Sequence, residues 1–195
     1  YSQQAADQLI KFPTIFYFNS FEDVCSAVEK GMCRYGILPI ENSAAGSVTA
    51  VYDLMLRHRF NIVRALRQQV RHVLLAPRGV KLQDVKTVHS HPQALAQCSE
   101  FLQSNPQMTA CPSGNTAVAA RDIAASGRKD AAVIASRACA ELYGLQVLSE
   151  DICNTSANYT RFICISKDCE IYPDTRKFSF MMTLAHRPGA LYGVM

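Results

Sequence analysis

Residues 36–48 read GILPIENSAAGSV, and they predict the change from a buried strand to a helix. Residues 35–40 are nearly all apolar and predict an inner strand, while apolar residues recur at helical spacing from Val48 onward. Small and polar residues fill the turn between the two: Glu41, Asn42, Ser43, Gly46 and Ser47. In open α/β sheets, small anions bind at such strand ends beside a helix N-terminus. Ser47 is explained equally well as a simple N-cap.

The same unit of strand, polar loop and helix recurs along the chain. Apolar strands are expected at residues 85–89, 108–111 and 131–135, and each precedes a predicted helix. The last of these helices is expected to stop at Gly144, before a short strand at residues 145–148. Strands that alternate with helices predict a largely parallel sheet covered on both faces.

Two segments interrupt this alternation and indicate two lobes. Residues 69–76 are predicted to form a strand entered directly from residues 60–66, and residues 160–166 a strand that follows a polar loop. Two chain crossings of this kind predict two α/β lobes with a cleft between them. We expect lobe 1 at about residues 1–70, lobe 2 at about 71–157 and a return to lobe 1 at about 158–167.

The C-terminal residues predict the beginning of another domain. Residues 168–177 have the composition of a linker, residues 178–185 form a predicted strand, and a helix is expected from Ala190. One strand and six helical residues cannot bury a core. We therefore interpret residues 178–195 as the first part of a second domain.

The composition limits the classes of protein and partner. The chain has 195 residues, 49% of them hydrophobic, and a net charge of +4, which suits a globular protein that binds an anionic small molecule. Its arginines are spread along amphipathic segments, so no nucleic-acid surface is expected. No apolar stretch is long enough to predict a membrane segment. Eight cysteines without a Cys-x-x-Cys pair predict reduced thiols in a cytoplasmic protein.

Three other strand ends also carry polar side chains. Ser90-His91-Pro92-Gln93 fits a capping box with Ser90 as N-cap and Gln93 at N3, and Asn115 and Thr116 also suit a helix start. The third group comes before an apolar run: Asn158, Tyr159, Thr160 and Arg161. Strand alternation points Thr160 and Phe162 to one face and Arg161 to the other. His89 and His91 lack further ligands nearby, so no metal is expected, and no cofactor motif is present.

Four of these segments together resemble the prephenate dehydratase family. They are GILPIENS with Gly46-Ser47-Val48, SHPQALAQC at 90–98, AELYGL at 140–145, and NYTRF at 158–162. They follow the family's order and span nearly the whole chain. Tyr1-Ser2 resembles the end of the family's opening motif, and Arg187-Pro188-Gly189-Ala190-Leu191-Tyr192 resembles the first loop of an ACT regulatory domain.

The resemblance implies a fold and a reaction. The fold would be two-lobed and similar to type II periplasmic binding proteins, followed by the start of a ferredoxin-like ACT domain. The reaction would convert prephenate to phenylpyruvate, water and CO2 without a metal or organic cofactor. Phenylalanine would act as an effector through residues that include Pro188, Gly189, Ala190 and Leu191. We also expect a homo-oligomer, either a dimer or a tetramer.

The resemblance also implies roles for single residues. Thr160 would bond to or protonate the leaving hydroxyl, with Glu41 as the alternative proton donor if burial raises its pKa. Arg161 would be a counter-charge unless it points away from the cleft. The remaining predicted substrate-binding residues are Ser2, Asn42, Ser43, Gly46, Ser47, Ser90, His91, Gln93, Asn115, Thr116, Asn158 and Phe162. Two alternatives stay open: an arogenate dehydratase, and a non-catalytic module that binds small anions.

Overall fold

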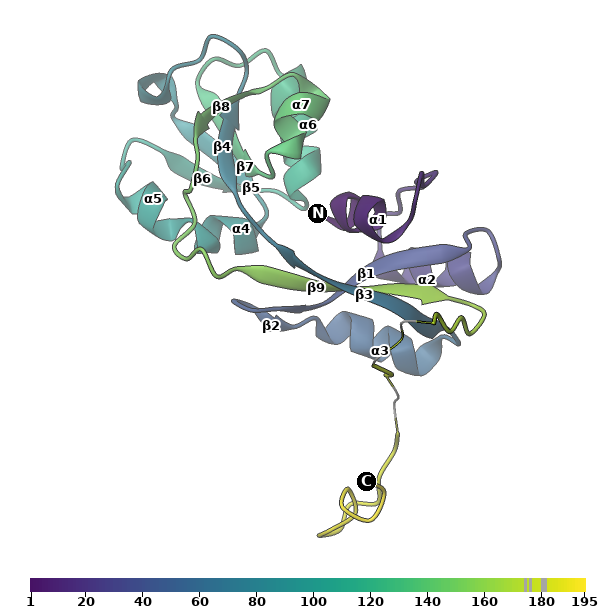
Figure 1. Cartoon of the computed structure of the whole chain (residues 1–195). Coiled ribbons are helices and arrows are strands. Elements are labelled where there is room, and N and C mark those ends of the chain that lie inside the picture. The colour runs from purple at the N-terminus through teal and green to yellow at the C-terminus, as the bar shows by residue number, and fades with distance from the viewer. Residues whose placement is uncertain (174, 176, 180–181) are drawn as a thin grey trace.

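The computed structural model describes residues 1–173, 175, 177–179 and 182–195. Figure 1 shows two lobes, each built on one sheet, and a C-terminal segment that lies apart from both. The two-lobed α/β fold expected from the sequence is therefore confirmed. The positions of the domain boundaries remain predictions.

Lobe 1 contains a four-stranded sheet in the order β2-β1-β9-β3, and every neighbouring pair is antiparallel. Its strands are β1 (Tyr35–Asn42), β2 (Gly46–Ser47), β3 (Asn61–Gln69) and β9 (Tyr159–Ser166). Its helices are α1 (Ser2–Leu9), α2 (Phe21–Glu29) and α3 (Thr49–Arg57). Figure 1 shows α1 and α3 on opposite faces of this sheet, with α1 on the side of lobe 2.

The core of lobe 1 packs α2 and α3 against β1 and β9. Leu38 and Ile165 are fully buried there, and the backbone of Gly36 lies close beneath α2. A Cβ atom at Gly36 would lie 2.8 Å from Val24 Cγ1 and 2.9 Å from Ile165 Cγ1. Glycine at this position therefore permits the close packing of helix on strand.

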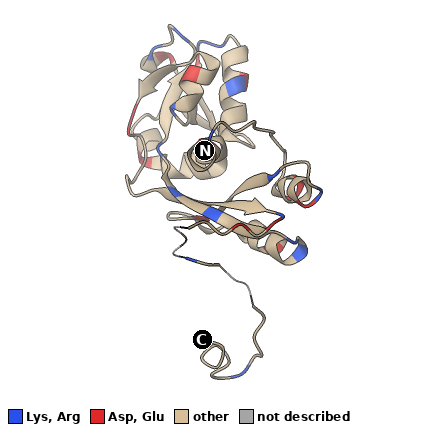
Figure 2. Cartoon of the chain, turned by 45° about the vertical axis from the view of Figure 1, so that its right-hand side comes forward, with Lys and Arg blue, Asp and Glu red and all other residues tan. Residues whose placement is uncertain are grey.

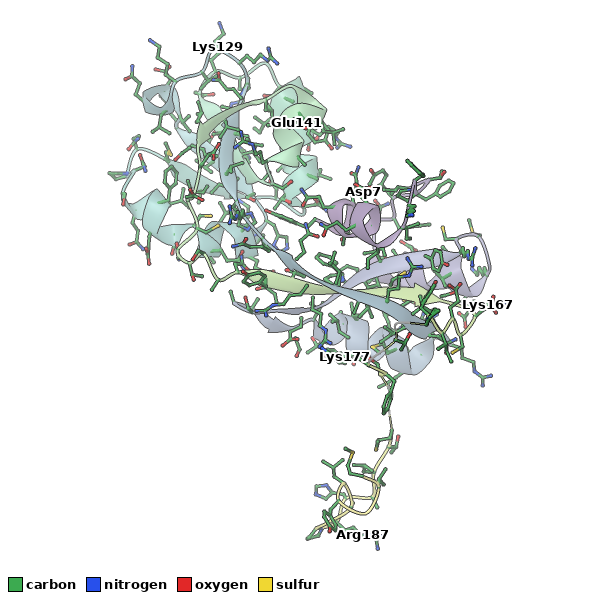
Figure 3. The ribbon with its side chains drawn as sticks, in the orientation of Figure 1. Asp7, Lys129, Glu141, Lys167, Lys177 and Arg187 are labelled. Carbon is green, nitrogen blue, oxygen red and sulfur yellow. The ribbon has the colours of Figure 1, made fainter. Side chains whose placement is uncertain are left out.

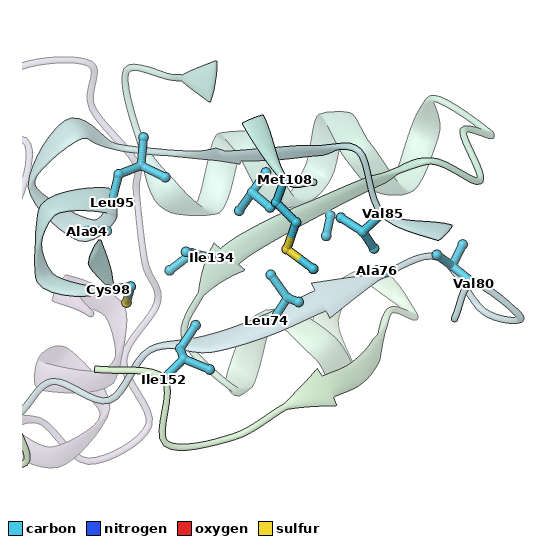
Figure 4. Packing of buried hydrophobic residues seen from close by; sticks show 12 residues of the cluster. Leu74, Ala76, Val80, Val85, Ala94, Leu95, Cys98, Met108, Ile134 and Ile152 are labelled. Atoms are coloured by element: carbon cyan, nitrogen blue, oxygen red, sulfur yellow. The ribbon is translucent and has the colours of Figure 1, made fainter. Parts of the chain in front are cut away.

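Lobe 2 contains a five-stranded mixed sheet in the order β6-β5-β7-β4-β8. Its strands are β4 (Val73–Ala76), β5 (Thr87–Ser90), β6 (Thr109–Pro112), β7 (Ala131–Ala135) and β8 (Gln146–Ser149). Its helices are the 3₁₀ helix η1 (Leu82–Asp84), α4 (Pro92–Gln97), α5 (Ser99–Gln103), α6 (Thr116–Ala125) and α7 (Ala138–Tyr143). Separate hydrophobic clusters lie on the two faces of the sheet. Figure 4 shows one of them, in which Leu74 and Ile134 project from the sheet near Met108.

The predicted, largely parallel sheet is only partly correct. β5 is parallel to β6 and to β7, but β4 is antiparallel to both of its neighbours, and lobe 1 is antiparallel throughout. The first predicted unit differs most, because after β1 the chain folds back as the short strand β2. Gly46 allows this turn with its φ of +81°.

The two predicted crossings between lobes are present. Residues 70–72 separate β3 from β4, which lie in different sheets. Of the strand predicted at 69–76, only residues 73–76 form a strand of lobe 2, and residue 69 is the end of β3. Residues 150–158 return the chain from lobe 2 to β9. The helix predicted after β5 is likewise divided into α4 and α5, because the backbone at Cys98 leaves the helical region (φ −120°, ψ 22°).

The chain after β9 first packs against lobe 1 and then leaves it. Tyr35 and Tyr172 donate hydrogen bonds to the carboxylate of Glu170, which also pairs with Arg34 at 3.2 Å. These contacts bring part of the predicted linker against β1. Figure 3 labels Lys167 beside the sheet of lobe 1, whereas Arg187 lies in the separate C-terminal segment.

The predicted strand at residues 178–185 and the helix from Ala190 are not formed among the described C-terminal residues. Residues 180 and 181 of that strand, and 174 and 176 of the linker, lie outside the described part of the chain. Residues 190–194 form hydrogen-bonded turns. A lone strand has no partner for its backbone groups, so regular structure is not expected from this segment by itself.

Candidate active site

A cluster of buried polar side chains lies where the two lobes meet. Asn42 at the end of β1 donates from Nδ2 to Thr160 Oγ1 at 2.9 Å and to Asn158 Oδ1 at 2.8 Å. Register places Asn42 opposite Thr160 on the neighbouring strand β9. Gln97, at the end of α4 in lobe 2, accepts from Asn158 Nδ2 at 3.0 Å and donates to Asn42 Oδ1 at 3.4 Å. The cluster therefore joins both lobes.

The backbone decides which way the Asn42 amide points. The N–H groups of Ala44 and Ala45 donate to Asn42 Oδ1 at 3.0 and 2.9 Å. Since only the oxygen of that amide accepts, Nδ2 must face Thr160. Thr160 Oγ1 is thus an acceptor from Asn42, and its own hydroxyl hydrogen is not used in that bond. A threonine held in this way can donate a hydrogen bond to a bound ligand.

Sequence reasoning assigned no role to two members of this cluster. Gln97 stood inside a quoted motif, and His72 stood inside a predicted strand. His72 is 3% exposed, with Nε2 at 3.0 Å from Gln97 Oε1 and Nδ1 at 3.1 Å from Tyr1 Oη. Burial lowers the pKa of His72. The sequence feature that could have identified His72 is a single histidine directly before the apolar run of β4. By itself, that feature suits a histidine in the core as well as a histidine in a functional site.

Glu41 and Arg161 lie on the other face of the sheet from Thr160. They are register partners across β1 and β9, and both side chains are exposed. The alternation predicted for Arg161 is confirmed, and it points away from the polar cluster. The burial on which a proton-donating Glu41 depended is absent, because the carboxylate is in solvent.

The loop after β1 is held by Ser43 rather than capped by Ser47. Ser43 Oγ donates to the Ala157 carbonyl at 2.9 Å and accepts from the Tyr159 N–H at 2.9 Å, so both hydrogen-bonding roles are occupied. The expected N-cap role of Ser47 is wrong. Ser47 is in β2, and α3 begins at Thr49 with Val48 as its N-cap. Gly46 and Ser47, the two residues of β2, are both exposed.

The predicted capping box at Ser90 is also wrong. His91 is the N-cap of α4, because its Nδ1 accepts from the Gln93 N–H at 3.2 Å. Ser90 is fully buried in β5 and donates to the Ile134 carbonyl of β7 at 2.6 Å. Proline at N1 of α4 shifts the cap to the residue directly before it. The exposed Gln93 side chain belongs to the first turn of the helix.

Asn115 and Thr116 start α6 as expected. Asn115 Oδ1 accepts from the Ala117 and Val118 N–H groups at 2.8 and 3.4 Å, and Thr116 is the first helical residue. Ser2 holds the same position at the start of α1. These helix starts present backbone N–H groups and a partial positive charge, which favour anions.

Phe162 is buried in β9, and the predicted effector residues lie outside both lobes. Phe162 is 3% exposed in β9, opposite Pro39 and Leu66, and lies on the same face of the sheet as Thr160. The predicted effector residues are in the separate C-terminal segment: Pro188, Gly189, Ala190 and Leu191.

A cavity with a volume of about 990 Å³ lies along α1, residues 12–21 and β1. Ser2 and Asn115 contribute to its wall, which is largely apolar. Thr160 and Asn42 do not line it. The polar cluster, and not the size of a cavity, therefore marks the candidate active site.

The distribution of charge adds no competing site. Figure 2 shows lysines and arginines scattered over both lobes and mixed with carboxylates. Within the described residues, no group of three or more histidine, cysteine or carboxylate side chains is arranged to hold a metal ion. The same residues contain no helix long and apolar enough to cross a membrane.

Comparisons with known proteins identify the family of the chain. Residues 1–170 match the family model described as prephenate dehydratase. The chain is 41% identical to arogenate dehydratase 2 of Petunia hybrida over 98% of its own length and 49% of that protein's. It is 38% identical to the chloroplastic arogenate dehydratase/prephenate dehydratase 2 of Arabidopsis thaliana, over 98% of this chain and 51% of that one. The chain thus spans about half the length of these curated relatives.

A solved structure shows the same fold. Prephenate dehydratase from Arthrobacter aurescens, in complex with L-Phe, has a TM-score of 0.84 and 26% identity, covering 98% of this chain and 66% of that one. The match runs through both lobes, and the sequence motifs that meet in the polar cluster lie inside the matched range. The chain belongs to the prephenate dehydratase family.

Proposed function

We propose that the protein converts prephenate to phenylpyruvate, water and CO2, and that Thr160 acts on the leaving hydroxyl. The observation that supports this role is the hydrogen bond from Asn42 Nδ2 to Thr160 Oγ1 at 2.9 Å. Because Thr160 accepts that bond, its O–H is available to a substrate oxygen. Proton donation to a leaving group typically accelerates a reaction by about 10²–10⁴-fold.

The reaction requires two contributions from the protein. In prephenate, the C–O bond to the ring hydroxyl and the C–C bond to the ring carboxylate break together, and the electron pair from the carboxylate side completes an aromatic ring. The hydroxide that leaves needs a proton, and the carboxylate that leaves as CO2 must be poorly solvated. A buried threonine in a network of neutral amides meets both needs, since amides donate hydrogen bonds without adding negative charge.

Thr160 is a weak acid by itself, so the amides around it are part of the proposal. Asn42 polarises the hydroxyl, and Asn158 and Gln97 hold Asn42 in place. Glu41 is a poorer candidate because it is exposed on the opposite face.

We propose that hydroxyls, amides and helix starts bind the two carboxylates of the substrate. The N-terminus of α6 with Asn115 and Thr116, and that of α1 with Ser2, present backbone N–H groups suited to anions. Ser90 and Ser43 contribute less directly, because their hydroxyls already bind backbone carbonyls. The mild positive charge of the chain favours a dianionic substrate.

Arogenate is the alternative substrate. One relative is named for arogenate alone and another for both compounds. The two substrates differ only in the side chain that carries a keto group in prephenate and an ammonium group in arogenate. Glu41, the carboxylate predicted for the site, lies on the other face of the sheet from Thr160 and is therefore not placed to pair with the ammonium group of arogenate, so we keep prephenate as the proposed substrate.

The test is a steady-state assay of the full-length protein with each substrate separately and then in competition. Phenylpyruvate formed at the higher kcat/KM supports the proposal, and phenylalanine formed from arogenate at the higher kcat/KM supports the alternative. Binding of both compounds without turnover would instead identify a non-catalytic binding module and overturn the proposed activity.

Regulation, assembly and location are also proposals. The Arthrobacter aurescens structure contains L-Phe, and we propose that phenylalanine inhibits the intact enzyme through a domain that starts near Phe178.

We propose a homodimer or homotetramer, to be measured by light scattering of the full-length protein. We propose a cytoplasmic location, although the Arabidopsis thaliana relative is named as chloroplastic. Cell fractionation distinguishes the two compartments.

A further inference from the structure

His72 is a buried titratable group to which the proposed reaction gives no direct role. It lies in residues 70–72, where the chain crosses from β3 in lobe 1 to β4 in lobe 2. Its ring is bonded on both sides, through Nε2 to Gln97 Oε1 at 3.0 Å and through Nδ1 to Tyr1 Oη at 3.1 Å. The ring also contacts Tyr1 edge to face, with centroids 5.6 Å apart. This histidine is therefore held in one orientation.

The orientation of each amide follows from the backbone N–H groups at the other end of the cluster. Those of Ala44 and Ala45 fix Asn42 Oδ1, and Gln97 must present Nε2 to that oxygen. Gln97 Oε1 then faces His72, where it also accepts from Asn158 Nδ2. An amide oxygen has no hydrogen to give, so the hydrogen between Gln97 and His72 belongs to the imidazole Nε2.

The surroundings of His72 favour a neutral ring with that hydrogen on Nε2. Burial is the main cause that lowers the pKa of His72, the bond to Gln97 opposes it, and the amino group of Tyr1 lowers it further. Two further titratable groups lie against His72: the Tyr1 phenol, and the Cys153 thiol, whose Sγ accepts from the His72 backbone N–H at 3.3 Å. A neutral imidazole donates from one nitrogen only, and the bond to Gln97 assigns that hydrogen to Nε2. The Tyr1 hydroxyl, 3.1 Å from Nδ1, donates its single hydrogen to the Arg71 carbonyl at 2.6 Å, so the contact with Nδ1 is the weaker of the two bonds at this ring.

We propose that His72 is a positioning residue of the dehydratase. Its Nε2–H holds the Gln97 oxygen, so that the Gln97 and Asn42 amides stay oriented and the Thr160 hydroxyl donates to the substrate. The series runs from His72 through Gln97 and Asn42 to Thr160 and crosses both lobes. The proposal rests on the proposed function, because it assigns the series a purpose in that reaction.

The kinetic test compares two variants of the full-length enzyme. His72→Leu keeps the bulk but has no donor, and we expect kcat to fall about tenfold, the effect of one buried hydrogen bond, with KM nearly unchanged. His72→Gln places an N–H2 group near the position of Nε2, and we expect it to restore most of kcat. His89→Leu is the matched control, since His89 Nε2 is buried without a hydrogen-bond partner in the described structure.

Two results would overturn the proposal. One is a folded His72→Leu enzyme with wild-type kcat, and the other is a folded His72→Gln enzyme as slow as His72→Leu, which would show that the ring only fills space. Nitrogen NMR of the wild-type imidazole provides a readout that does not depend on turnover. Hydrogen on Nε2 supports the inference, and hydrogen on Nδ1 refutes it even if the enzyme is active. Absence of turnover in the wild type would instead refute the proposed function.

Discussion

Replacing Thr160 by valine is the sharpest test of the candidate active site. Valine has nearly the same shape as threonine and the same preference for a strand, so the change removes only the hydroxyl. The change removes the 2.9 Å hydrogen bond from Asn42 Nδ2 to Thr160 Oγ1. The carbonyl of Tyr159 lies 3.2 Å from Asn42 Nδ2 and can accept the hydrogen bond in its place. No buried donor is therefore left without an acceptor.

The expected effects on stability and on turnover are very different in size. Losing one neutral hydrogen bond costs about 0.5–1.5 kcal/mol. For a chain of this length that lowers Tm by about 1–6 °C, since each kcal/mol corresponds to about 2–4 °C. Losing the donor to the leaving hydroxyl should lower kcat by about 10²–10⁴-fold, which is about 2.7–5.4 kcal/mol of activation free energy. The variant should therefore be folded and nearly inactive.

The assay is the rate of phenylpyruvate formation from prephenate by full-length wild-type and Thr160→Val enzyme, with Tm measured on the same samples. Thr109→Val is the matched control, because Thr109 is an exposed threonine in β6 of lobe 2. A Thr160→Val enzyme with kcat within about threefold of wild type would refute the role of Thr160. So would an equal loss of kcat in the control.

Three further predictions concern packing, pH and regulation. Gly36→Ala should lower the free energy of unfolding, measured by urea denaturation, by about 1–3 kcal/mol, because the new methyl group would lie less than 3 Å from two core side chains. Gly114→Ala is the control, since a methyl group there meets nothing within 4 Å. The hydrogen bonds that His58 donates to the carboxylates of Glu29 and Glu22 raise the pKa of His58. The stability that these bonds provide is complete below the ordinary value of 6.5 and is lost as pH rises through the raised value. Glu29→Gln should therefore lower Tm at about pH 5.5 and hardly at about pH 9, and an equal loss at both would contradict this. Phenylalanine should inhibit the intact protein but not a version ended near residue 175, and inhibition that survives this truncation would place the effector site elsewhere.

Most single strands and two chain crossings were predictable from the sequence because they depend on local pattern. The apolar run of β7 is buried at all five positions, and Gly144 ends α7 in the left-handed conformation. Asn115 caps α6 as its residue type predicts. Alternation along β9 correctly separated Thr160 and Phe162 from Arg161.

The errors came from choices between neighbours that local pattern leaves open. Ser47 and His91 show this for helix starts, since Ser47 pairs in a hairpin and His91 takes the cap expected of Ser90. Strand direction was missed for the same reason. Whether a strand runs parallel or antiparallel to its neighbour depends on which other segment it pairs with, and β9 pairs with strands at least ninety positions earlier in the chain, the nearest pair being Gln69 and Tyr159.

The sequence by itself determined the family, the two lobes and the residue types that meet at the site. It did so because motifs, apolar periodicity and turn residues are written in neighbouring positions. Only the tertiary structure decided that Asn42, Gln97 and His72 form one series with Thr160, and that Glu41 faces away from it. The physical reason is that the orientation of an amide or imidazole depends on its partners in space. Here those partners come from β1, β9, α4 and the crossing between the lobes.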